Sequence, residues 1–291
     1  MDATSPTIGF SGDLDDPWVE EIARALRDFE PTPYDPDGAS LPPEAFDPEH
    51  GPDVLVLHRS RLSPADVARL EELRRALGPS AWPRIVLCVS PYVRYAEIER
   101  CSGLVELVVP EATAAETLPR QLERMLGRAP GRSKRLAAEA MPVEVVSSDY
   151  ALRQVLSEAC ARAGYRTAEA ASLAPPPEAA PTPGRRLTVW DVPVLEARWE
   201  ERLERRSRQG PVLALLGFAD RASVALARAA GAAACLDLPC AMEDLIDALD
   251  RLARDPARPR VEAAHATPPA PTARPSRSRT RPARALQAGA E

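Results

Sequence analysis

The stretch LTVWDVPVLEARWEERLERRSRQGPVLALLGF, residues 187–218, places a highly charged segment between two apolar runs. The runs LTVWD (187–191) and VLALLGF (212–218) are as continuously apolar as strands that are buried on both faces of a sheet. Between them, LEARWEERLERRSRQ (195–209) has the length of a helix, and its glutamates and arginines can pair four residues apart on a solvated face. Strand, helix and strand in this order predict two parallel strands joined by a crossover helix.

The same alternation continues on both sides of this stretch and then occurs a second time in the chain. The remaining elements predicted for the second half are strands at 143–146, 166–171 and 233–238 and helices at 150–164, 221–231 and 241–254. Those predicted for the first half are strands at 7–10, 53–57, 84–89 and 105–109 and helices at 18–29, 65–77, 92–100 and 114–126. Each half is therefore expected to form a parallel sheet with helices on both faces.

Proline and capping residues mark several of these boundaries. Asp16-Pro17 and Ser63-Pro64 place a proline at the start of a helix, which is a favoured position. Thr113 with Glu116 predicts a capping box for the last helix of the first half. The segments before the third strand of each half, 31–52 and 174–184, are rich in proline, so the second helix of each half is expected to be lost or shortened.

We predict four segments on this basis. A first domain at 1–128 and a second at 142–255 are separated by a linker at 129–141. Residues 256–291 form a Pro/Ala/Arg-rich tail that lacks any apolar periodicity and is expected to be disordered.

The composition limits the mechanisms and binding partners that the chain can have. The chain has 36 Arg but a single lysine, Lys134, so a mechanism that needs an ammonium group has only that residue. Residues 258–291 hold seven Arg and two Glu, a net charge of +5, which leaves −11 on the rest of the chain. An acidic body is a poor binder of nucleic acid, so only non-specific contact by the tail is expected.

The cysteines and the N-terminus point to a soluble cytoplasmic protein. The five cysteines have no metal-ligand spacing, which argues against both a disulfide framework and a zinc site. The N-terminus lacks the basic region and apolar core of a signal peptide, and no apolar run reaches the roughly 20 residues of a membrane helix. A phosphate-binding loop is not apparent either, since GFSGDLDD (9–16) carries acids that would repel phosphate.

Several ordered segments resemble one protein family. They are VEVVSSDYALRQVL, LTVWDVP, PVLALLGF and ALARAAGAAACLDLPCAMEDLIDAL in the second half and, more loosely, DVLVLHR, RIVLCVS and LVELVVPEATAAETL in the first. Both halves resemble response-regulator receiver domains, and the set covers most of residues 7–254. The resemblance implies an α/β fold with two tandem flavodoxin-like (βα)5 domains, each with a parallel five-stranded sheet.

The resemblance also implies a chemistry. In receivers, an aspartate that ends the third strand accepts a phosphoryl group, and two acidic residues after the first strand hold Mg²⁺. A Thr or Ser ending the fourth strand and a Lys ending the fifth, just before a proline, contact the phosphoryl oxygens. These cations and donors are needed because negative charge must be neutralised on the transferred group.

Most of these positions are degenerate here. In the second half, Asp191 is the candidate phosphoacceptor. The other positions are Ser147 and Ser148 for the metal pair, followed by Asp149, with Leu216 for the hydroxyl and Leu238, before Pro239, for the lysine. In the first half they are Ser11, Gly12 and Asp13 for the metal pocket, His58 for the acceptor, Val89 for the hydroxyl (with Ser90 adjacent) and Val109, before Pro110, for the lysine.

We therefore predict a non-enzymatic pseudo-receiver protein that acts by protein–protein interaction in two-component-type phosphorelay signalling, without a cofactor. Its partner would be a histidine kinase or response regulator, bound through the surfaces formed by the family's helices four and five. Two alternatives stay open: an inefficient but genuine phosphoacceptor modified at Asp191, with weak Mg²⁺ near Asp149 and Asp191, and a structural scaffold unrelated to signalling. His58 is a weaker candidate for phosphorylation or metal binding, because no second ligand lies at a useful spacing.

Overall fold

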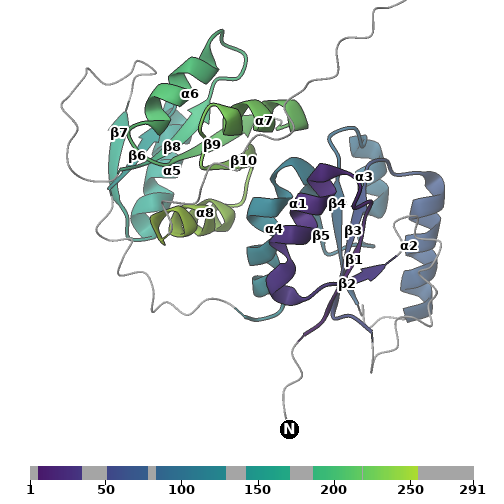
Figure 1. Cartoon of the computed structure of the whole chain (residues 1–291). Helices are drawn as coiled ribbons and strands as arrows, with labels where there is room; N and C mark the ends of the chain where they lie inside the picture. Colours follow the sequence, from purple (N-terminus) through teal and green to yellow (C-terminus); the bar gives the residue numbers. More distant parts are fainter. Residues whose placement is uncertain are drawn as a thin grey trace, which may run out of the picture.

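The computed structural model describes residues 6–34, 51–77, 83–128, 142–170, 186–217 and 219–254. They form two α/β halves that lie side by side (Figure 1). The elements of the first half are β1 (Ile8–Ser11), α1 (Pro17–Ala25), a short 3-10 helix η1 (Arg27–Phe29), β2 (Thr32–Tyr34), β3 (Val54–Arg59), α2 (Pro64–Leu77), β4 (Arg84–Val89), α3 (Tyr95–Cys101), β5 (Leu107–Pro110) and α4 (Glu111–Met125). The elements of the second half are β6 (Pro142–Val146), α5 (Tyr150–Arg162), β7 (Arg166–Ala170), β8 (Leu187–Val192), α6 (Trp199–Ser207), β9 (Val212–Gly217), α7 (Arg221–Ala229), β10 (Ala234–Leu238) and α8 (Met242–Arg254).

Both sheets have the same topology. The strand orders are β2-β1-β3-β4-β5 and β7-β6-β8-β9-β10, and every pair of neighbouring strands is parallel. This 2-1-3-4-5 order defines the flavodoxin-like class of doubly wound folds. The predicted fold class, two tandem flavodoxin-like domains, is confirmed.

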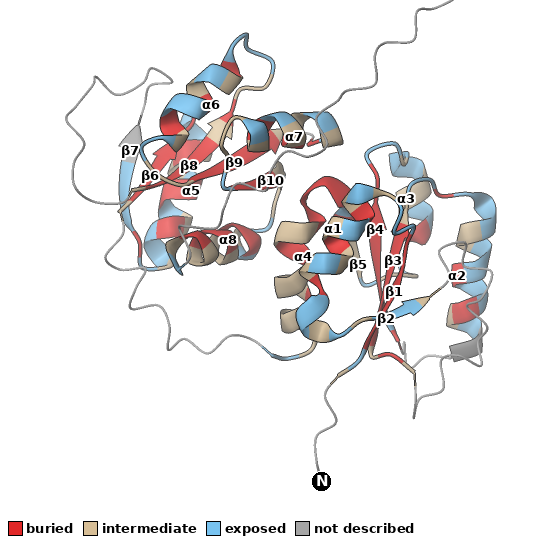
Figure 2. Cartoon of the chain, in the orientation of Figure 1, coloured by how far each residue is buried: buried red, intermediate tan, exposed pale blue. Residues whose placement is uncertain are grey.

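The core of each half lies on both faces of its sheet. In Figure 2 the central strands are almost entirely buried, whereas the outer faces of the helices are exposed. In the first half, Ile8 and Val56 pack with α1 and α4 on one face, and Leu55 and Leu57 pack with α2 on the other. Residues that alternate along a strand thus cover opposite faces, which is why the apolar runs in the sequence are continuous.

The helix starts that involve proline are as expected at two positions. Asp16 caps α1 by accepting a hydrogen bond from the Trp18 N–H at 2.9 Å, and Pro17 is the first helical residue. Pro64 is likewise the first residue of α2.

Several predicted boundaries differ from the structure. Helix α4 begins at Glu111 instead of 114, with Pro110 at its N-cap, so the Thr113–Glu116 capping box was wrong. Helix α6 begins only at Trp199, because Arg198 adopts a left-handed conformation with φ of 64° that ends the preceding loop. Helix α3 begins at Tyr95 and strand β5 at Leu107, each later than predicted.

Some predictions fall outside the described residues. The predicted reductions of the second helices fall largely at 35–50 and 171–185, and the linker and tail at 129–141 and 256–291, none of which the structure describes. The domain boundaries stay predictions. Among the helices that are described, none has the length and apolar character to cross a bilayer.

Candidate functional site

The carboxyl ends of the parallel strands bring the predicted site residues of the second half together. Ser147 directly follows β6, and Asp191 lies near the end of the neighbouring strand β8, because Val146 pairs with Trp190. The Ser147 hydroxyl donates a hydrogen bond to Asp191 Oδ2 at 2.7 Å. Ser147 is buried, whereas Asp191 is half-buried. The candidate acceptor therefore already has a hydroxyl partner.

Asp149 serves the helix that follows. Its Oδ1 accepts a hydrogen bond from the Leu152 N–H at 3.0 Å, which caps α5. Its own N–H donates to the Ser147 hydroxyl oxygen at 3.0 Å. Ser148 is exposed. Asp149, the acid that directly follows the two metal-pair positions in the sequence, therefore caps a helix.

The remaining positions of the second pocket are apolar. Leu216 is fully buried on β9, and Leu238 is half-buried at the end of β10. A cation does lie near the strand end: Arg153, on α5, donates from Nη1 to the Ser147 carbonyl oxygen at 2.7 Å. This guanidinium binds the main chain, and it was not identified from the sequence.

In the first half, the acceptor position holds a buried histidine. His58 lies near the end of β3 with 5% of its surface exposed, and its Nε2 lies 2.6 Å from Oε2 of Glu111. Gly12 makes room for it, since a Cβ atom at Gly12 would lie 3.0 Å from His58 Cβ and 2.8 Å from Val19 Cγ1. The acceptor position of the first half is therefore occupied by a buried histidine paired with Glu111.

The other predicted residues of this pocket are either uncharged or exposed to solvent. Ser11, Val89 and Val109 are buried, and the Ser90 hydroxyl oxygen accepts a hydrogen bond from the Tyr92 N–H at 3.1 Å. Asp13 is exposed, and its Oδ1 accepts from the Asp15 N–H at 3.1 Å.

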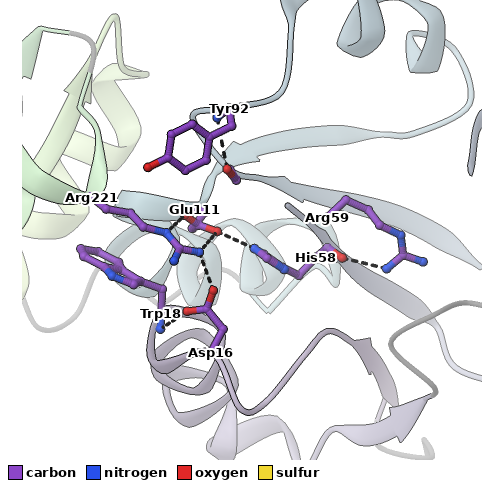
Figure 3. A network of polar contacts seen from close by, with 8 residues as sticks. Asp16, Trp18, His58, Arg59, Tyr92, Glu111 and Arg221 are labelled. Carbon is purple, nitrogen blue, oxygen red and sulfur yellow. Dashed lines mark hydrogen bonds and ion pairs between the residues drawn. The ribbon is translucent and has the colours of Figure 1, made fainter. Parts of the chain in front are cut away.

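Glu111 connects this pocket to the second half (Figure 3). It is the first residue of α4, and its side chain is completely buried. The guanidinium of Arg221, from α7, donates from Nε to Oε1 and from Nη2 to Oε2, the latter at 2.7 Å. The same Nη2 donates to Oδ2 of Asp16 at 2.7 Å. Histidine, two carboxylates and an arginine thus form one continuous network.

Electrostatics favours the charged forms of Glu111 and Arg221. Burial alone would raise the pKa of Glu111, but the hydrogen bonds and charges of Arg221 and His58 outweigh it and hold that pKa below its ordinary value of 4.5. The hydrogen bonds to Glu111, together with those to Asp16, raise the pKa of Arg221. The arginine is therefore a permanent cation that two acids already neutralise.

The sequence resemblance did not identify Glu111 or Arg221. Glu111 follows the Val109-Pro110 pair that replaces the family's lysine and proline, and this unusual acid was the available signal. Arg221 offered none, because its partner lies 110 positions away. A second buried ion pair was also missed: Arg206 on α6 lies 3.6 Å from Glu144 on β6, and its guanidinium lies over the Trp190 ring.

Metal-binding groups are not gathered in the part of the chain that the structure describes, where no cluster of three or more His, Cys, Asp or Glu side chains could hold an ion. The five cysteines are free, and four of them are buried. Burial raises the pKa of Cys240, the fifth, to about 11. Cys235 and Cys240 therefore have the environment of packed thiols.

Neither a protein-family model nor a curated protein matches this sequence. A CheY-like response regulator receiver domain protein from Methanospirillum hungatei JF-1 has 19% identity over 40% of this chain and 94% of its own, with a TM-score of 0.34. Chemotaxis protein CheY4 from Vibrio cholerae has 25% identity over 38% of this chain and 97% of its own, with a TM-score of 0.32. The C-terminus of E. coli RcsC, which contains a linker region and a phosphoreceiver domain, has 15% identity over 86% of this chain and 94% of its own, with a TM-score of 0.30.

CheY-like receiver domains are thus among the structures similar to this chain. The fold assignment itself rests on the strand order and the parallel pairing of both sheets.

Proposed function

We propose that this protein is a pseudo-receiver adaptor, which binds a protein partner in two-component-type signalling and does not use a phosphoryl switch. The observation that carries this proposal is the state of the two acceptor positions. Asp191 is hydrogen-bonded to Ser147, and His58 is bound to Glu111, which in turn binds Arg221. Both positions are occupied by contacts within the chain.

Phosphoryl transfer needs cations at the acceptor, because charge develops on the equatorial oxygens. In the second half, the positions that would hold metal or contact phosphate are Ser147, Ser148, Leu216 and Leu238. In the first half, a cation is present, but Glu111 and Asp16 neutralise it. The first pocket therefore offers a phosphoryl group no uncompensated positive charge, and in the second pocket the guanidinium of Arg153 donates to the Ser147 carbonyl oxygen.

The predicted docking surface needs one correction. The family's helices four and five correspond to α7 and α8 in the second half, and this surface faces α1 and α4 of the first half. It is therefore covered in the intact chain. In the first half, the corresponding helix α3 stays accessible, with Tyr92 and Tyr95 exposed by 74% and 78%. We place partner docking on this α3 region.

An inefficient phosphoacceptor is the second candidate. It is favoured by Asp191 alone, which lies at the carboxyl end of β8 and is partly accessible to solvent. Ligands bind at this edge in doubly wound folds.

Intact mass distinguishes the two candidates. The protein is incubated with acetyl phosphate and Mg²⁺, and the wild type is compared with Asp191→Asn. We expect no stable mass gain in either. A phosphoryl adduct that appears in the wild type and is lost in Asp191→Asn would contradict the adaptor proposal and support the phosphoacceptor.

Docking is tested by capture from a lysate of the source cells. The bait is the wild type, a Tyr92→Ala/Tyr95→Ala variant, or Tyr150→Ala, a control whose exposed tyrosine lies on the second half. A histidine kinase or response regulator should be retained by the wild type and the control and lost from the double variant. Equal retention by all three baits would show that α3 is not the docking site.

A further inference from the structure

The two halves contact each other through an ordered interface. Helices α1 and α4 of the first half lie against α7, β10 and α8 of the second (Figure 1). Ala112, on α4, belongs to an apolar cluster with Val224 and Cys235 of the second half, and Trp18 packs against the same cluster. Strand β10 is the edge of its sheet, so α4 covers an edge that would otherwise be exposed.

Two arginines of α7 carry the polar part of this interface. Arg221 binds Glu111 and Asp16, as described above. About two turns further along the same helix, Arg228 donates from Nη1 to Glu21 and from Nη2 to Glu116, both at 2.9 Å. Both guanidinium groups lie over the Trp18 ring. The distance from Cζ to the ring centroid is 5.9 Å for Arg221 and 5.5 Å for Arg228.

The polarity is reversed on the neighbouring helix. There, Arg124 of the first half binds Asp244 and Asp247 on α8. Gln121 adds a hydrogen bond to Asp244 at 2.8 Å. Because cations project from both halves, the relative orientation of the two surfaces is specified as well as their attraction.

We propose that the former acceptor pocket of the first half is a guanidinium-binding site, and that Arg221 of the second half is its ligand and latches the two halves together. The pocket presents two oxygens of one buried carboxylate to Nε and Nη2 on one edge of the guanidinium, a second carboxylate to Nη2, and an aromatic ring beside it. His58 holds Glu111 from the other side at 2.6 Å.

This geometry favours the planar guanidinium group of arginine over the ammonium group of lysine. Arginine can donate in parallel to both oxygens of Glu111 and still reach Asp16, whereas lysine offers one compact ammonium. The latch keeps the α7–β10–α8 surface covered, so the chain behaves as one body. The inference does not depend on signalling, because it concerns only how the halves hold each other.

The test uses the full chain with a protease site introduced within residues 129–141. The protein is folded intact and then cut, and dissociation of the halves is followed by analytical ultracentrifugation. Arg221→Ala and Arg221→Lys are compared with Arg208→Ala, a control whose arginine is 68% exposed and pairs with Glu204 on α6. Circular dichroism before cutting establishes that each variant is folded.

The halves of the wild type and of Arg208→Ala should stay associated at micromolar concentration. Loss of one partner of a buried charge pair should raise the dissociation constant of Arg221→Ala by about 30-fold or more. Arg221→Lys should also be weakened, by about tenfold. Guanidinium chloride at about 10 mM, far below its denaturing range, should restore part of the association of Arg221→Ala, whereas ammonium chloride at equal ionic strength should not.

Three results would overturn the inference: separation of the wild-type halves on cutting, equal dissociation constants for Arg221→Ala and Arg208→Ala, or identical rescue by both salts. A phosphoryl adduct at Asp191 would contradict the proposed function and leave these measurements unaffected, so the two failures are distinguishable.

Discussion

Two carboxylates of α4, Glu111 and Glu116, face arginines of the same helix α7, but neutralising them should have effects of very different size. Glu111 has hydrogen bonds at both oxygens, from Arg221 and from His58. Burial raises the pKa of Glu116 despite the charge of Arg228. Among the described residues, its Oε2 finds no hydrogen-bond partner. Glu111→Gln should therefore be costly, whereas Glu116→Gln should be nearly neutral.

The magnitude follows from the contacts. Removing one partner of a buried ion pair costs about 3–5 kcal/mol. Glutamine keeps the volume and one acceptor oxygen, and Asp16 still binds Arg221, so we expect a loss of roughly 2–3 kcal/mol. At this chain length that corresponds to a melting temperature lower by about 4–12 °C. For Glu116→Gln, the cost of burying the carboxylate offsets most of its attraction to Arg228, so we expect the free energy of unfolding to change by no more than about 1 kcal/mol.

The pH dependence provides a second measurement. Because the pKa of Glu111 is lowered on folding, its contribution is fully present above the ordinary value of 4.5 and is lost as the pH falls through the lower folded value. The difference in urea midpoint between wild type and Glu111→Gln should shrink as the pH falls below 4.5. Equal effects of the two substitutions at pH 7, or a Glu111→Gln deficit that persists unchanged into strong acid, would refute the reasoning.

Three further sets of substitutions test the local structure. Gly12→Ala should lower stability by about 1–3 kcal/mol in chemical denaturation, because its methyl group would press on His58. Asp149→Ala should cost about 1 kcal/mol through loss of the α5 cap, and Asp149→Asn, which preserves the acceptor, should restore most of it. Glu144→Leu alone should cost about 3–5 kcal/mol by leaving buried Arg206 unpaired, whereas Glu144→Leu with Arg206→Met should melt at or above the wild-type temperature.

Most of the strands were predictable because their signal is local, but the short strand β2, which is largely exposed and contains Pro33, was not predicted. A parallel strand buried on both faces must be apolar throughout, so runs such as 54–57 and 212–216 could be identified without knowledge of their neighbours. The start of α1 was equally local, since Asp16 and Pro17 act within one turn. The start of α4 was not: residue preference favoured Thr113 as the cap, but β5 runs to Pro110 and the helix follows at once.

The candidate site divides in the same way. Ser147 and Asp191 could be placed together, because neighbouring parallel strands end at the same edge of the sheet. The partner of His58 could not, since Glu111 comes from the helix after the last strand, and Arg221, the partner of Glu111, comes from the other half of the chain. Pairing between halves leaves no periodicity or spacing in a single sequence.

The buried acid Glu111 explains why the two pockets differ. A lysine at position 109 would place its own cation near the end of β5; valine there leaves that end without one, and Glu111 would then be a buried carboxylate supported by a histidine alone. Such a charge is tolerated only when it is paired and hydrogen-bonded. Arg221 supplies the pairing from the second half, so the first pocket is electrostatically complete only when the halves are docked. The second pocket contains no equally buried acid, and a serine suffices to bind Asp191. The buried acid that follows β5 therefore makes the first half dependent on contact with the second.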